Sequence, residues 1–205
     1  MASGPRYSVP FRRRREGRTD YRSRRELLRS RLPRLVVRLS NRNTIVQVIE
    51  YRPEGDHVLA SATTLELAGL GWDKPTGNLP GAYLAGLLAG TRAQGRLPDG
   101  AILDLGLLPP VPGSKVFAAL KGVLDAGVKV PHGTEVLPPD ERLRGTHVGP
   151  GIPELVQKVA TTISGGKVTV GGSPKGAGKK PAPKAPDGPA APSLEEQLSK
   201  RKTKS

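Results

Sequence analysis

The sequence predicts an α/β fold in which a mixed β-sheet is flanked by helices. Three apolar, β-branched segments follow one another between residues 34 and 63, separated by short polar turns, which is typical of an antiparallel meander. Helical and strand-like segments then alternate, and this alternation indicates an α/β layer fold with a mixed sheet. The composition changes at both ends of this region. We therefore expect a basic arm with a short helix over residues 1–33, a core domain over 34–164 and a disordered tail over 165–205.

The start of the arm is predicted to be extended and solvated. Residues 5–18 contain Pro10 and Gly17, which oppose a helix, and they carry almost no apolar mass to bury. Tyrosine, phenylalanine and arginine side chains therefore project from a segment that has no core of its own.

A short helix should follow the extended segment. Thr19 or Asp20 can cap its first turn, and Pro33 ends the helical pattern after Arg31. The apolar side chains of this helix can dock on the core while its arginines, three and four residues apart, share another face: Leu27, Leu28 and Leu32 on one side, Arg22, Arg25 and Arg29 on the other.

Three strands are expected over residues 34–41, 44–51 and 57–63. Arg42 and Asn43 separate the first two, and the polar sequence RPEGD separates the second from the third. Short polar turns between β-branched segments favour antiparallel neighbours, so the three strands should form a meander.

The first half of the remaining core is predicted to be helix, helix and strand. A helical pattern over residues 64–70 ends at Gly71, and a longer helix should run over about 79–94. The apolar segment 101–107 is bounded by glycine and predicts a strand covered on both faces.

The second half begins with a rigid, proline-containing loop over residues 109–114 and a helix over 115–127. Residues 128–131 are expected to form a short last strand, and Pro153 begins a final helix over 153–163. From residue 165 the chain is rich in Gly, Pro, Ala and Lys and cannot bury enough surface to order itself, although 193–202 could become helical.

Charge is distributed very unevenly along the chain. The first 38 residues carry thirteen arginines and three acidic side chains, a net charge of +10, whereas residues 39–164 carry a net charge of −1 and the tail +6. So many crowded cations repel one another unless a polyanion neutralises them, and the planar guanidinium is suited to phosphate. The expected partner is nucleic acid.

Composition argues against several other classes of protein. There is no cysteine, which excludes disulfides and thiolate zinc sites, and His57, His132 and His147 lack metal-ligand spacing, so we expect no metal and no cofactor. No apolar segment is long enough to cross a bilayer, and no signal peptide is evident. We expect a soluble, intracellular protein that has no membrane partner and no small-molecule substrate.

Aromatic side chains are interleaved with the arginines of the arm. Tyr7, Phe11 and Tyr21 are three of only seven aromatic residues in the chain. Aromatic rings without a surrounding core can stack on unpaired bases, which favours structured RNA over plain duplex DNA. Two alternatives remain open at this point, a solvated targeting segment and an unspecific DNA-compacting protein.

Two further positions could contact nucleic acid. Gly113 and Ser114 precede Lys115 at the start of a predicted helix, so amides, a hydroxyl and an ammonium group could converge on a phosphate, although simple helix capping explains the same residues. Trp72 with Lys74 could place an indole against a nucleotide, but a single tryptophan is more often a packing anchor.

Catalytic interpretations have little support. Glu50, Asp104 and Asp125 could form the metal site of a nuclease with a ribonuclease-H-like fold, but no spacing links them and structural roles are favoured. The tail sequence SPKGAGKK lacks the first glycine and the final Ser or Thr of a phosphate-binding loop, and no strand or helix flanks it.

Several long motifs resemble one known family. They are YSVPFRRRREGRTDY, PRLVVRLSN, EYRPEGD, LAGLGW, AYLAGLLAG, AILDLGL, GSKVFAALKGVLDAGVKVPH and ERLRGTHV. Together they are similar to the archaeal and eukaryotic branch of the large-subunit ribosomal protein eighteen family, the 5S rRNA-binding protein of the central protuberance. The likeness is collinear from about residue 7 to residue 163.

The resemblance implies a non-enzymatic ribosomal protein of the cytoplasm, with 5S rRNA, 23S rRNA and neighbouring large-subunit proteins as partners. It also implies a sheet order of 3-2-1-4-5, in which the first and fourth strands are parallel neighbours. Its RNA-binding motifs fall on Tyr7, Phe11, Arg12, Arg13, Arg14, Arg15, Arg18, Tyr21, Arg22, Arg24 and Arg25 in the arm, to which the helix adds Arg29, and on Gly113, Ser114 and Lys115 in the loop. Val111 departs from the polar or basic residue expected at its position, and the tail has no counterpart in the family.

Overall fold

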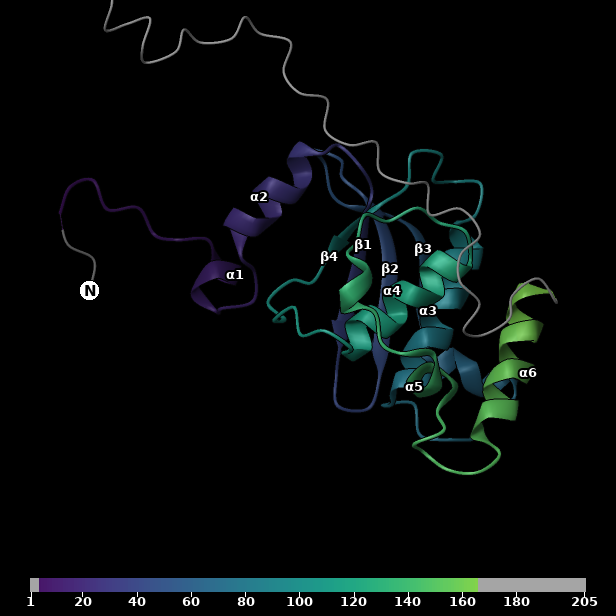
Figure 1. Cartoon of the computed structure of the whole chain (residues 1–205). Helices are drawn as coiled ribbons and strands as arrows, with labels where there is room; N and C mark the ends of the chain where they lie inside the picture. The colour runs from purple at the N-terminus through teal and green to yellow at the C-terminus, as the bar shows by residue number, and fades with distance from the viewer. Residues whose placement is uncertain (1–3, 166–205) are drawn as a thin grey trace, which may run out of the picture. The chain divides into compact units, whose positions relative to one another are not determined.

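A four-stranded sheet lies at the centre of the structure, a computed structural model that describes residues 4–165 (Figure 1). The strands are β1 (Arg34–Leu39), β2 (Thr44–Glu50), β3 (His57–Thr63) and β4 (Ile102–Asp104), in the order β3-β2-β1-β4. β1 and β2 pair antiparallel, as do β2 and β3, whereas β4 runs parallel to β1. The predicted meander and the mixed sheet are confirmed.

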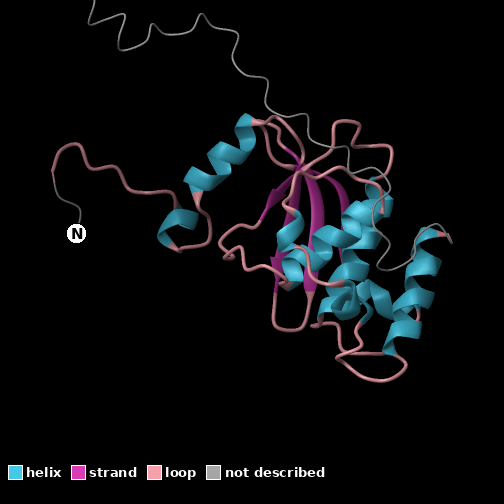
Figure 2. Cartoon of the chain, viewed as in Figure 1, coloured by secondary structure: helices cyan, strands magenta, loops and turns pink. Residues whose placement is uncertain are grey.

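Helices pack on one face of this sheet (Figure 2). α3 packs on β2 and β3, α4 packs on β1, and the two helices lie against each other. The helices of the core are α3 (Leu79–Ala93), α4 (Lys115–Asp125), α5 (Asp140–Arg144) and α6 (Ile152–Ser164), with 3-10 helices η1 (Thr64–Leu70) and η2 (Thr134–Val136). The predicted helices of the core are present within one or two residues of their expected ends.

The core forms between alternate strand residues and the two central helices. Leu35 and Val37 of β1 and Val46 and Val48 of β2 are completely buried. α3 is buried on nearly all sides, and its alanine and glycine residues bring its main chain close to that of α4. Gly71, with a φ of +92°, ends η1 in the left-handed conformation that the sequence predicted.

The predicted fifth strand is absent. Residues 128–131 make one backbone hydrogen bond toward the β4 segment, in which Ala101 N–H donates to the carbonyl of Lys129 at 2.9 Å, and they form no ladder. Gly127 has a φ of +92° and Pro131 cannot donate, so too few residues remain for a strand. In the described part of the chain the sheet ends at β4, which is only three residues long and half-buried at its first two positions.

The arm also differs from expectation, because Arg12–Arg15 form a single helical turn, α1. Pro10 precedes this turn and Gly17 follows it with a φ of +64°, so both helix-breaking residues lie outside it. The next helix, α2 (Tyr21–Arg29), is close to the predicted one. The predicted disordered tail lies outside the described residues except for Gly165, and among the described residues no helix is long and apolar enough to cross a bilayer.

Side chains cover the outer edge of β3, the strand that ends the sheet opposite β4. Arg92 Nη1 donates to the carbonyl of Ser61 at 2.6 Å, and Arg96 Nη1 donates to the carbonyl of Leu59. Glu66 accepts from Thr63 N–H at 2.9 Å and pairs with Arg92 at 2.6 Å. Three main-chain groups that a neighbouring strand would otherwise pair with are thus already bonded.

Candidate nucleic-acid interface

The arm presents its arginines to solvent. Arg12–Arg15 of α1 are all exposed, and their charges are partly balanced by Glu16, which lies 3.6 Å from Arg12 and 3.3 Å from Arg18. Phe11 is 72% exposed and Tyr7 49% exposed. Two large exposed aromatic side chains therefore lie close in the chain to a run of exposed guanidinium groups, a combination of the types suited to stacking on bases and to binding phosphate.

An aromatic pair and a helix cap order the rest of the arm. The rings of Phe11 and Tyr21 lie 5.3 Å apart at 44°, so they join α1 to the first turn of α2. Asp20 caps α2 as predicted, because its Oδ1 accepts from the N–H groups of Arg22 at 2.9 Å and Ser23 at 3.3 Å. The predicted choice between Thr19 and Asp20 is resolved in favour of Asp20.

The arginines of α2 point in two directions. Arg22, Arg25 and Arg29 are exposed, as the spacing of three and four residues predicted, and Arg29 also pairs with Glu26 at 3.2 Å. Arg24 instead lies against the core, where its Nη2 donates to both carboxylate oxygens of Asp56 at 3.0 and 2.9 Å. The structure therefore separates one predicted RNA-contacting arginine from the others.

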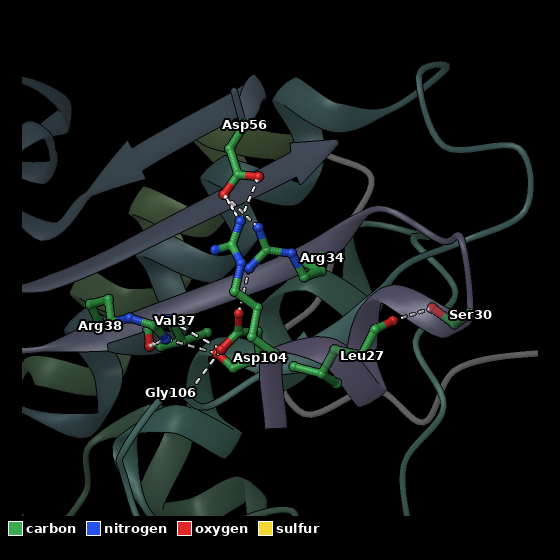
Figure 3. A network of polar contacts seen from close by, with 9 residues as sticks. Leu27, Ser30, Arg34, Val37, Arg38, Asp56, Asp104 and Gly106 are labelled. Atoms are coloured by element: carbon green, nitrogen blue, oxygen red, sulfur yellow. Dashed lines mark hydrogen bonds and ion pairs between the residues drawn. The ribbon is translucent and has the colours of Figure 1, made fainter. Parts of the chain in front are cut away.

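Arg24 belongs to an ion-pair network formed by Arg24, Asp56, Arg34, Asp104 and Arg38 (Figure 3). Arg34, only 3% exposed, bridges the two acids: its Nη2 donates to Asp56 at 2.6 Å and its Nη1 to Asp104 at 2.7 Å. Arg38 adds a bond from Nη2 to Asp104 Oδ1 at 3.1 Å. The network connects α2, β1, β4 and the turn before β3.

The charge state of Asp104 follows from this setting. Burial by itself would raise the pKa of Asp104, but the charge of Arg38 and hydrogen bonds from Arg34, Arg38 and the Gly106 N–H outweigh it and lower the pKa below its usual 3.8. Gly106 N–H donates to Asp104 Oδ1 at 2.8 Å. Asp104 is therefore an ionised structural group at neutral pH.

A cleft of about 660 Å³ lies between the arm and this edge of the sheet. Arg13, Arg18 and Tyr21 line it from the arm, and Arg38 and residues 105–108 line it from the core. Arg13 Nε donates to Thr19 Oγ1 at 2.9 Å, so its guanidinium is held by a neutral group rather than a carboxylate. Asp20, Asp56 and Asp104 also line the cleft, so its walls combine cationic, acidic and apolar groups.

The loop at residues 113–115 lies at the start of α4 and does not line the cleft. Gly113, with a φ of +70°, donates its N–H to the Val136 carbonyl at 2.9 Å, and Lys115 Nζ donates to the Gly77 carbonyl at 3.3 Å. Ser114 occupies the N-cap position, but its side chain makes no capping hydrogen bond. The first amides of α4 consequently have no side-chain acceptor.

Two other sites weighed from the sequence do not form. Trp72 is 3% exposed and belongs to the hydrophobic core, so the favoured interpretation of this residue as a packing anchor is confirmed and the alternative contact with a nucleotide is not. The three acids weighed as a metal site each pair with a different cation. Glu50 pairs with Arg52 at 3.1 Å, Asp125 with Lys121 at 2.8 Å, and Asp104 with Arg34 and Arg38. Across residues 4–165, no three acidic, histidine or cysteine side chains converge on a metal site.

The sequence reasoning missed Arg34, Arg38 and Asp56 as residues that line the cleft. Arg34 and Arg38 lie on the same face of β1, four residues apart along the strand, and this alternation was a usable signal. The sequence contains no comparable signal for Asp56, because it lies in a polar turn, where aspartate is common for reasons of turn geometry alone.

Comparison with known proteins identifies the family. Residues 5–99 match the family described as ribosomal large subunit proteins 60S L5, and 50S L18. Three relatives are each named large ribosomal subunit protein uL18. The relative from Haloarcula marismortui is 55% identical over 148 residues, covering 72% of this chain and 79% of the relative. The relative from Natronomonas pharaonis is 54% identical over 148 residues (72% and 80%), and that from Methanoculleus marisnigri is 49% identical over 163 residues (80% and 93%). Because similarity of this extent covers most of both chains and confirms the likeness carried by the motifs, the chain belongs to the archaeal uL18 family of large ribosomal subunit proteins.

Proposed function

We propose that the protein binds 5S rRNA through its N-terminal arm and helps attach it to 23S rRNA in the central protuberance. As a member of the uL18 family it is a structural component of the large ribosomal subunit, in the cytoplasm, and not an enzyme. Neighbouring large-subunit proteins are further proposed partners. No observation favours the nuclease considered from the sequence.

One observation carries this proposal: most of the arm's cations lack a carboxylate partner. Seven arginines of the arm form no ion pair with a described residue: Arg6, Arg13, Arg14, Arg15, Arg22, Arg25 and Arg31. Their mutual repulsion is relieved when phosphates lie between them, and the counterions released from RNA supply much of the binding free energy.

The proposed RNA contacts in the arm are Tyr7, Phe11, Arg12, Arg13, Arg14, Arg15, Arg18, Tyr21, Arg22, Arg25 and Arg29. The loop Gly113–Ser114–Lys115 is proposed as a second contact, since the first amides of α4 have no side-chain acceptor and Lys115 lies beside them. Exposed Phe11 and Tyr7 are suited to unpaired bases, which supports structured RNA as the ligand.

The arm can be tested without changing the core. Substituting Gln for Arg12, Arg13, Arg14 and Arg15 should weaken 5S rRNA binding about a hundredfold at moderate salt. If all four arginines meet phosphates, the slope of log affinity against log salt should become shallower by about three. Filter binding across a salt series measures both quantities.

A matched control removes the same charge from the core. Substituting Gln for the exposed residues Lys129, Arg142, Arg144 and Lys158 should leave 5S rRNA affinity within a few-fold of wild type. An equal loss in this control would show that net charge, rather than the arm, determines binding. Equal affinity of the wild type for 5S rRNA and random duplex DNA would favour the DNA-compacting alternative.

A further inference from the structure

We propose that Asp56 is a positioning residue for RNA binding, because it docks α2 on the core and so sets the direction in which the arm presents its arginines. This inference rests on the proposed function and concerns how the same site is organised. Asp56 itself is an anion and does not bind the RNA.

The contact between Asp56 and α2 is geometrically specific. Arg24 approaches both oxygens of the carboxylate, at 3.0 and 2.9 Å, and the side chains of Arg24 and Asp56 are 32% and 26% exposed. Both hydrogen bonds start from one nitrogen, Nη2, so they hold the end of the Arg24 side chain between the two carboxylate oxygens. This charge-assisted contact fixes the point at which α2 is attached to the core.

Asp56 is in turn held from the core side. Arg34 Nη2 lies 2.6 Å from its Oδ2, and Arg34 cannot move freely because it is 3% exposed and also bound to Asp104 at 2.7 Å. The Asp104 carboxylate is 7% exposed and receives Arg38 and the Gly106 N–H as well. Arg24 thus docks on a carboxylate that the core has already fixed in place.

The remaining attachments of α2 are slight. None of its nine residues is fully buried, and Leu27 and Leu28 are only half-buried. A helix of this length is not stable alone in water, so its position depends on tertiary contacts. Loss of the Arg24–Asp56 contact should therefore leave α2 and the arm free to reorient.

Electrostatics alone predicts the opposite effect of removing this acid. Asp56→Asn raises the net charge by one and frees Arg24 for phosphate, so a purely electrostatic arm would bind RNA more tightly. A positioned arm would bind more weakly, because its ordering then has to occur on the RNA. The sign of the change distinguishes the two descriptions.

The experiment compares Asp56→Asn with Glu54→Gln in the full chain. Glu54 is an exposed residue of the same turn with no ion pair among residues 4–165, so its substitution gives the same charge change without touching the network. Asp56→Asn should weaken 5S rRNA binding about tenfold, whereas Glu54→Gln should bind as tightly as wild type or slightly tighter. Asp56→Asn binding at least as tightly as Glu54→Gln would overturn the positioning role.

A second measurement does not depend on RNA. The chain has no cysteine, so spin labels can be placed uniquely at Ser23→Cys on α2 and Asp99→Cys on the core. The distance distribution in the free protein should be narrow in the wild type and broaden with Arg24→Gln, but not with Arg25→Gln, which removes an unpaired arginine from the same helix. Equal distributions in all three proteins would overturn the proposal.

These outcomes are separable from failure of the proposed function. Wild type that does not prefer 5S rRNA over random RNA would contradict the proposed function. Wild type that does prefer it, combined with an unweakened Asp56→Asn variant, would contradict only the role of Asp56. Thermal unfolding of each variant checks that the core remains folded.

Discussion

Gly86 of α3 packs directly on the main chain of Ala119 in α4, so closely that a Cβ added to Gly86 would clash with the Ala119 carbonyl group. Gly122 of α4 lies in the same way against the Tyr83 carbonyl. The two helices that cover the sheet therefore meet backbone to backbone, and neither can retreat without opening the core around it.

Gly86→Ala should destabilise the protein strongly. The added methyl group meets main-chain atoms of α4 rather than a movable side chain, so the helices have to separate, at a cost of about 3 kcal/mol or more. Urea unfolding followed by circular dichroism measures the change. Gly69→Ala is the control, since nothing lies within 4 Å of a Cβ at Gly69 and its loss of stability should be small. Equal stability of the two variants would show that α3 and α4 are not packed as described.

Asp104→Asn should reduce stability in a pH-dependent manner. At neutral pH the substitution leaves Arg34 buried without one of its two acidic partners, which costs about 3 kcal/mol. Because folding lowers the pKa of Asp104, the carboxylate contributes its full stabilisation above the usual value of 3.8, and this contribution is lost as the pH falls through the lower, folded value. The difference between wild type and variant should therefore shrink on acidification below about pH 4.

The effect of Asp104 is measured as the difference in unfolding free energy between wild type and Asp104→Asn, because Asp125 changes the stability of both proteins with pH in the opposite direction. Burial, with the nearby charge of Asp140, raises the pKa of Asp125 more than the Lys121 ammonium and the hydrogen bond from Tyr83 lower it. Its contribution to stability is therefore present at low pH and is lost as the pH rises. Asp99→Asn, an exposed acid, should show neither the loss at pH 7 nor the dependence. A constant difference between wild type and Asp104→Asn from neutral pH to pH 3 would contradict the assigned charge state.

Substituting Ala for Arg92 and Arg96 together should open the outer edge of β3 to other chains. The carbonyl groups of Ser61 and Leu59 lose their donors, and an unpaired strand edge favours association with a second copy of the same strand. Sedimentation at rising protein concentration should detect more dimer in this variant than in the wild type. The control substitutes Ala for Arg142 and Arg144, exposed residues whose loss changes the charge equally. A double variant at positions 92 and 96 that associates no more than the wild type would show that the arginines are not needed to protect the edge.

Patterns of neighbouring residues predict those parts of the fold that short-range interactions determine. The meander follows from β-branched segments separated by polar turns, and the cap at Asp20 follows from its place before a helical pattern. The short turn of helix at Arg12–Arg15 cannot be predicted in this way, because Pro10 and Gly17 oppose a helix in the sequence whereas in the structure they lie just outside the turn.

Contacts between residues far apart in the sequence cannot be predicted from such local patterns. Nothing local distinguishes Arg24 from Arg22 or Arg25, and its different role arises from Asp56, 32 residues further along the chain. Trp72 was ambiguous for the same reason, since only the assembled core shows that its indole is enclosed. The exposed arginines of the candidate site were predictable from charge density, but the residues that hold them in place depend on the tertiary structure.

The order of the ion-pair partners along the chain has a consequence for synthesis. Arg34 precedes Asp104 by 70 residues, so during translation the arginine leaves the exit tunnel well before the acid that will hold it. At about 5–20 residues per second this delay is roughly 4–14 s. During that interval Asp56, which follows Arg34 by 22 residues, is the only one of the arginine's two acidic partners that has been made, and the network can be completed only after about half of the polypeptide has emerged.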